Sequence, residues 1–135
     1  MSFVVRCRAN DLGEVPEAFL DQRRGLVRTT ALPLTVGCSY VVFAITNSVG
    51  GFWYFVLDDD DRGIPLSYPS AVFDVEEGVV PLGWSVGHGR SSRYGLTVVV
   101  GPVEWAGDPS FYERLYDGDE GAVEAFQRIR SDLGQ

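Results

Sequence analysis

Hydrophobic and polar residues alternate at the beginning of the chain. Within residues 3–9, Val5 and Cys7 fall on one side and Arg6 and Arg8 on the other. A period of two is typical of a strand with one buried face. The pattern therefore predicts that the fold opens with a half-buried strand.

A short helix is predicted after this strand. Pro16 stands where a helix can begin without losing a hydrogen bond, and Phe19 and Leu20 supply an apolar side. Gly25 follows two arginines and provides a stop signal. We expect about two turns of helix here.

The middle of the chain predicts a β-hairpin. Residues 40–46 and 52–57 are rich in aromatic and β-branched side chains, and residues 47–51 between them carry Asn, Ser and two Gly. Such segments separated by turn residues favour paired strands. Both strands are apolar on both faces, so we expect one face to pack into the main core. The other should meet a helix, a curled sheet or a partner.

Further strands are predicted at residues 71–75 and 96–100, with the turn Glu76-Glu77-Gly78 after the first of them. The intervening Gly-rich segment, residues 83–95, is interpreted as a surface loop.

The period changes to a helical one at the C-terminus. Asp108 can cap a helix that has Pro109 in its first position, and Asp119 can cap a second helix. In the second helix the apolar residues at positions 122, 126, 129 and 133 form one stripe. Strands first and helices last indicate an α+β fold. We expect a single domain over residues 1–135, built as a strongly bent antiparallel sheet or small open barrel. One short N-terminal helix and two C-terminal helices accompany the sheet.

Composition narrows the possible functions. The chain has 135 residues, a formal charge of -8, and 11 basic residues that are all Arg. The absence of Lys excludes P-loop chemistry and lysine Schiff bases. Residues 58–135 hold 15 acidic residues against 6 Arg, so the negative charge belongs to this part. Such a field repels nucleic acid and anionic membranes and attracts basic partners.

The N-terminus lacks an apolar run of signal-peptide length, and no stretch is long enough for a membrane helix. We therefore expect a cytoplasmic protein. Cys7 and Cys38 have only His88 as another soft ligand, so a zinc site is not expected. The interpretation is two reduced thiols buried on strands.

One motif resembles a hydrolase signature. Residues 83–87 read Gly-Trp-Ser-Val-Gly, and His88 follows Ser85 by three positions. In serine hydrolases this motif links a strand to a helix, and a carboxylate orients the histidine. Neither a helix start nor an orienting carboxylate is evident here. The protein is therefore expected not to be an enzyme, and a hydrolase built on Ser85 and His88 stays a minor alternative.

A run of four aspartates follows the hairpin. Asp58, Asp59, Asp60 and Asp61 resemble the start of a calcium-binding loop, but Arg62 and Pro69 occupy positions that need ligands. The alternatives are a solvated loop, a contact surface for a cationic partner, or a weak ion site.

The aromatic side chains suggest a binding surface beside these acids. A strand cannot point the four rings of residues 52–55 at one core, and a large ring beside an acidic loop is typical of an interface. Trp53 and Trp84 are predicted to be exposed or half-exposed anchors. The candidate partner-binding residues are Asp58, Asp59, Asp60, Asp61, Trp53, Trp84, Glu76 and Glu77.

A family resemblance rests on a pattern of strands, turns and acidic loop. The pattern comprises residues 34–37, 40–42, 53–54, 58–59 and 68–69, and Phe73. It resembles small bacterial immunity proteins, the inhibitors encoded beside polymorphic or contact-dependent toxins. The resemblance implies a protein without enzymatic activity or cofactor that binds and blocks one toxin domain.

Two functions therefore remain in view. In the first, the acidic half of the chain covers the active site of a basic toxin domain, with charge accelerating encounter and rings prolonging the contact. The alternative is a small-ligand-binding or adaptor domain that uses the hollow of the bent sheet.

Overall fold

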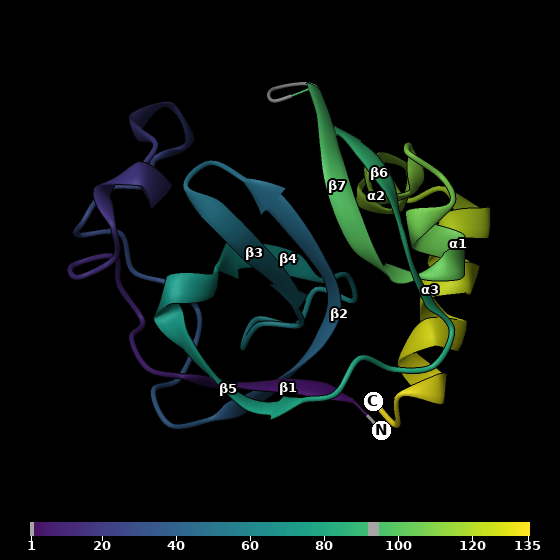
Figure 1. Ribbon diagram of the computed structural model, residues 1–135, viewed down its shortest axis with the longest axis horizontal. Coiled ribbons are helices and arrows are strands. Elements are labelled where there is room, and N and C mark those ends of the chain that lie inside the picture. Colours follow the sequence, from purple (N-terminus) through teal and green to yellow (C-terminus); the bar gives the residue numbers. More distant parts are fainter. Residues whose placement is uncertain (1, 92–94) are drawn as a thin grey trace.

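The computed structural model describes residues 2–91 and 95–135, and it has an α+β fold in which helices pack on one side of an antiparallel sheet (Figure 1). The described strands are β1 (Phe3–Cys7), β2 (Ser39–Ser48), β3 (Gly51–Val56), β4 (Leu66–Pro69), β5 (Phe73–Gly78), β6 (Trp84–Ser91) and β7 (Gly95–Pro102). The described α-helices are α1 (Val103–Ala106), α2 (Phe111–Tyr116) and α3 (Glu120–Asp132). None of the helices in the described ranges is long and apolar enough to cross a membrane.

Strand β2 organises the sheet because three strands pair with it. The strand order is β4-β3-β2-β1-β5, and the β6–β7 hairpin joins through β7. One edge of β2 pairs with β3, so β1 and β7 share the other edge. The first residues of β2 pair with β1, while Ile45 and Thr46 pair with β7. The sheet therefore divides beyond β2 into two arms and does not close into a barrel.

A β-bulge bends β2 in its middle. The register with β3 shifts between Val42 and Ala44, and Val42, Phe43 and Ala44 are all buried. Three consecutive buried residues do not fit a regular strand, whose side chains alternate between faces. The extra residue sends Phe43 to the helices while Val42 stays on the opposite face.

The hairpin of β2 and β3 separates two hydrophobic cores. The first core holds residues of the N-terminal segment together with β1, β4 and β5. The second holds residues of the helices packed on β2, β3 and β7, among them Phe43, Phe55, Trp105 and Phe126. The hairpin is apolar on both faces because each face contributes to one of these cores. Of the three alternatives predicted for the second face, a helix, a curled sheet or a partner, the helices pack there.

The N-terminal helix is replaced by two short 3₁₀ turns, at Glu17–Phe19 and Gln22–Arg24. The chain is extended at Leu20 between them, so the pattern there does not sustain a continuous helix. Gly25 ends the second turn at φ 71°, a conformation that favours glycine.

Both predicted C-terminal helices are present. Asp119 caps α3 by accepting a hydrogen bond from the backbone N–H of Ala122, as predicted. The other helix starts at Phe111 with Ser110 as its N-cap, so the prediction that Asp108 caps it and Pro109 is its first residue is wrong. Helix α1 was not predicted, because four residues are too few for a helical period.

Residues 84–91 of the Gly-rich segment form a strand rather than the predicted surface loop, and residues 92–94 of that prediction lie outside the described residues. The strand is β6, which pairs with β7 along its length. Helix α1 lies directly on this strand, and a Cβ at Gly87 would lie 1.7 Å from the carbonyl oxygen of Ala106. Gly87 therefore serves close packing of strand and helix rather than loop flexibility.

Candidate functional site

The four aspartates after β3 are largely occupied by the protein itself. Asp58 is buried, and its carboxylate accepts hydrogen bonds from the Tyr68 hydroxyl and from the backbone N–H groups of Asp60 and Asp61. The Oδ1 of Asp59 accepts a 2.6 Å bond from Tyr40 Oη. Burial, followed by this hydrogen bond to Asp59, raises the pKa of Tyr40 to about 12. Asp58 is thus a structural residue that shapes the loop.

The side chains of Asp60 and Asp61 differ in whether they have a partner. Asp61 pairs with Arg130 of α3 at 3.1 Å, whereas the exposed side chain of Asp60 makes no hydrogen bond within the described residues. Since the four groups do not converge, the loop does not form an ion cage. Among the described residues there is no group of three His, Cys, Asp or Glu that could hold a metal ion.

The glutamates of β5 divide in the same way. Glu76 accepts hydrogen bonds from the Ser39 hydroxyl and the Arg6 guanidinium, which lower its pKa. Glu77 is exposed, with no side-chain hydrogen bond in the part of the chain that the structure describes. Asp59 and Glu76 are both tied to the first residues of β2, through Tyr40 and Ser39.

The two predicted tryptophan anchors differ. Trp53 is 1% exposed, so the prediction that it is an exposed or half-exposed anchor is wrong. Its ring packs against Phe19, its indole N–H donates to the backbone oxygen of Val49, and the Arg24 guanidinium lies 5.3 Å above it. The hairpin turn folds back over this ring and buries it. Trp84 is half-buried, as predicted.

Ser85 and His88 do not form a catalytic pair. They lie on one strand, with Ser85 opposite Gly101 and His88 opposite Val98. An odd spacing along a strand sends side chains to opposite faces. The serine and the histidine therefore point to different sides of the hairpin, and this geometry removes the hydrolase alternative built on them.

The two thiols lie on adjacent segments but in different surroundings. Cys7 is buried on β1, and burial raises its pKa. Cys38 is exposed and directly precedes β2, so the expectation that both thiols are buried on strands is wrong for Cys38. Both are free thiols.

An apolar surface covers the side of the sheet that faces away from α1–α3, which we call the front face. Residues directly opposite in antiparallel strands share a face. Val100 pairs with Val86 of β6 and with Ile45 of β2, so these three side chains share a face. Trp84 and Val98 lie two residues from Val86 and Val100 on the same strands and so share this face, as does Tyr54, which pairs with Ile45. The front face comprises Phe3, Ile45, Tyr54, Val75, Trp84, Val86, Val98 and Val100.

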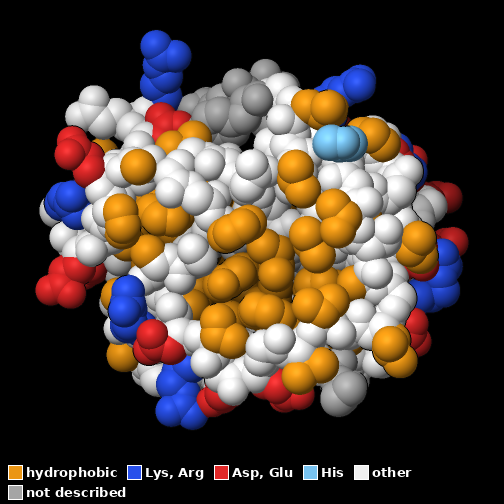
Figure 2. Space-filling view, in the orientation of Figure 1, with side chains coloured by type: hydrophobic (Ala, Val, Ile, Leu, Met, Phe, Trp, Pro, Cys, Tyr) orange, Lys and Arg blue, Asp and Glu red, His pale blue; other side chains and the backbone are white. Residues whose placement is uncertain are grey.

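This front face is open to solvent. Val86 is 70% exposed, Val75 54% and Val98 40%. Figure 2 shows an apolar area in the middle of the molecule, while the charged side chains lie mainly toward the outline of the molecule in this view. An exposed apolar patch with a polar rim marks a surface that contacts another molecule.

A cavity of about 230 Å³ lies on the other face of the sheet, beneath the helices. Phe55, Val99, Trp105 and Tyr112 form its apolar wall. The polar lining residues are Arg24, Thr46, Ser48, Ser67, Arg90, Thr97 and Asp108. The Trp105 and Tyr112 rings stack with an interplanar angle of 14° and centroids 5.6 Å apart, so the wall is preformed.

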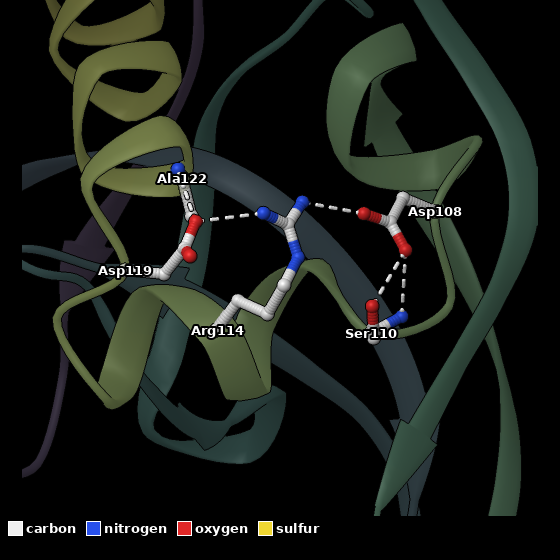
Figure 3. Close-up of polar contacts among 5 residues, drawn as sticks. All are labelled: Asp108, Ser110, Arg114, Asp119 and Ala122. Atoms are coloured by element: carbon white, nitrogen blue, oxygen red, sulfur yellow. Dashed lines mark hydrogen bonds and ion pairs between the residues drawn. The ribbon is translucent and has the colours of Figure 1, made fainter.

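A polar cluster fixes the cavity rim (Figure 3). Arg114 bridges Asp108 at 2.6 Å and Asp119 at 2.8 Å, and the other oxygen of Asp108 accepts bonds from the N–H and hydroxyl of Ser110. The bonds from Arg114, followed by those from Ser110, lower the pKa of Asp108. Asp108 therefore stays ionised and committed to the cluster.

Sequence reasoning missed both surfaces. The alternation of Trp84, Val86 and His88 against Ser85, Gly87 and Gly89 was a strand signal that the glycine content concealed. The cavity brings together segments more than 80 positions apart, so no local pattern indicates it.

No family model matches the chain, and no curated protein or solved structure matches it either. The functional argument therefore depends on the residues and their geometry.

Proposed function

We propose that the protein is an immunity-type inhibitor that binds a cognate basic toxin domain and covers its active site. The observation that carries the proposal is the open apolar front face on a protein whose formal net charge is -8. Its half-exposed rings, Trp84 and Tyr54, are the amphipathic type enriched in interface centres.

The acidic residues act mainly on the rate of encounter. Asp60 and Glu77 are exposed, and their charges add to a field that draws a basic domain toward the protein. The buried Asp58 and the paired Asp59, Asp61 and Glu76 hold the loop and the β1–β5 arm in place. The front face then supplies the desolvated contact that sets the lifetime of the complex.

A toxicity rescue assay tests the proposal. The domain encoded beside the gene is co-expressed with the protein in bacteria, where the wild-type protein should restore growth. Val86→Asp places a charge in the centre of the front face and should abolish rescue. Val86 is 70% exposed, so the free energy of unfolding should change by only about 0.5 kcal/mol.

Val103→Asp is the matched control. Val103 is 55% exposed at the start of α1, on the helix side of the sheet, where an acidic residue near a helix N-terminus is tolerated. This variant should rescue growth as the wild type does. Equal rescue by both variants, or loss of rescue by both, would contradict the assignment of the front face.

The second candidate function is a small-ligand-binding domain, which the cavity beneath the helices supports.

A further inference from the structure

The cavity beneath the helices lies on the face of the sheet opposite the front face, so it is a separate site. Thr46 and Val99 line it, and these two residues pair across β2 and β7 with their side chains toward the helices. An apolar cavity of about 150 Å³ accommodates benzene. A volume of about 230 Å³ therefore has room for one aromatic ring and a short polar tail.

The aromatic wall suits a flat ring. Phe55 meets the Trp105 ring edge-on at 4.9 Å, and Tyr112 lies 4.7 Å from Phe55 and stacks on Trp105. The Tyr112 hydroxyl donates to the backbone oxygen of Pro65 at 2.7 Å, which holds this ring in place. Rings in such offset and edge-on arrangements attract a further ring beyond the effect of area alone.

One polar atom in the wall lacks a partner. Trp105 is 2% exposed, yet its indole N–H donates no hydrogen bond to any described residue. Among the described residues, every fully buried side-chain nitrogen or oxygen has a hydrogen-bond partner. Since this indole nitrogen has none, it is not fully buried and solvent reaches it. Trp105 also lines the cavity. An occupant gains from offering an acceptor there, because a donor left unpaired in a wall costs free energy.

The charges around the cavity favour an anion. Arg24 lines it, and Arg90 borders it from β6, on the side of that strand that also carries Val86. The one acid in the lining, Asp108, already has its oxygens engaged by Arg114 and Ser110. The guanidinium carbon of Arg24 lies 5.3 Å from the centroid of the Trp53 ring.

We propose that this cavity binds a small organic carboxylate with a single aromatic ring. The ring lies against Phe55, Trp105 and Tyr112. The carboxylate accepts the indole N–H of Trp105 and faces the positive charge of Arg24. This site goes beyond the toxin-blocking function and does not depend on it.

Phenylacetate is the probe for the test, with phenethylamine and acetate as comparisons. Phenethylamine keeps the ring but is a cation, and acetate keeps the carboxylate without the ring. The full chain, labelled with ¹⁵N in tryptophan, is titrated with each compound while the indole N–H resonances are followed by NMR. The Trp105 resonance is the one missing in Trp105→Phe, and that of Trp84, on the front face, is the internal reference.

Phenylacetate should shift the Trp105 resonance in a saturable way and leave that of Trp84 unchanged. Phenylacetate should bind about tenfold more tightly than either comparison compound, because phenethylamine lacks the carboxylate and acetate lacks the aromatic ring. A Trp105 resonance that phenylacetate leaves in place, or equal affinity for phenethylamine, would overturn the proposal.

Two variants locate the binding. Arg24→Gln should weaken phenylacetate binding about fivefold or more, because a charge-assisted contact is lost. Arg23→Gln, in the same 3₁₀ turn but outside the cavity lining, should leave the affinity unchanged.

Ser67→Leu should fill the cavity from β4 and abolish binding, with folding checked by the dispersion of the other resonances. Equal effects of the two arginine variants, or full binding by Ser67→Leu, would contradict this location.

Discussion

Gly87→Ala tests whether the Gly-rich strand exists to let α1 approach the sheet. The added Cβ would lie 1.7 Å from the carbonyl oxygen of Ala106 and 2.6 Å from its carbonyl carbon, where real contacts are not closer than 3.0 Å. Both neighbours are backbone atoms, so rotating a side chain cannot relieve the clash. Strand and helix must separate by about 1.3 Å or more, which is the difference between the 3.0 Å limit and the 1.7 Å contact.

Overpacking of this kind costs about 1–3 kcal/mol, and displaced backbone places Gly87→Ala at the upper end of that range. The entropy gained by replacing glycine is below about 1 kcal/mol and does not offset it. We therefore expect the free energy of unfolding to fall by about 2–3 kcal/mol. At roughly 4 °C per kcal/mol, the thermal midpoint should fall by about 10 °C.

Urea and thermal unfolding followed by circular dichroism measure this effect. Gly121→Ala is the matched control, because Gly121 lies in the first turn of α3 and its nearest contact would be 3.4 Å away. This variant should be neutral or stabilising by up to about 1 kcal/mol. If Gly87→Ala were as stable as the wild type, the packing of α1 on β6 described above would be wrong.

Three further predictions concern the loop, the polar cluster and the charge. Tyr68→Phe removes a donor from the buried Asp58 and should lower the free energy of unfolding by about 1–3 kcal/mol; an unchanged urea midpoint would show that this bond does not hold the loop. The pKa of Asp108 is depressed below its ordinary 3.8 in the folded protein, so the pair with Arg114 stabilises the fold above about pH 4, and this stability is lost as the pH falls through the folded pKa. Arg114→Gln should therefore reduce the difference between the unfolding midpoints at pH 7 and pH 3, and an equal difference in the two proteins would refute the link. Under the proposed function, association with the toxin domain should slow as salt rises, and the double charge reversal Asp60→Arg with Glu77→Arg should slow it further while dissociation stays within about twofold. A change confined to dissociation would assign these acids to the contact itself.

The fold was predictable where the residues of a segment determine its secondary structure without contacts from distant segments. The β2–β3 hairpin, the cap of Asp119 and the apolar stripe of α3 all follow local rules, and the structure confirms them. The N-terminal helix was not predictable in detail, since the contacts that make two 3₁₀ turns come from residues such as Gly50, which is packed against Ala18 and Phe19.

The candidate sites were predictable only in part. Consecutive aspartates indicate solvent exposure, yet Asp58 is buried because Tyr68, ten residues later, brings a hydroxyl to it. Strand β6 escaped prediction because glycine usually marks a turn, whereas here it marks contact with a helix that begins only at Val103. Both cases depend on contacts between segments, which composition and periodicity do not encode.

The most direct test of the proposed function is a methyl NMR spectrum of the protein with and without the toxin domain. The methyl resonances of Val75, Val86 and Val98, on the front face, should shift or broaden when the domain is added, while that of Val103 on α1 should stay in place. Shifts centred on Val103 and the helices, with the front-face valines unchanged, would contradict the account.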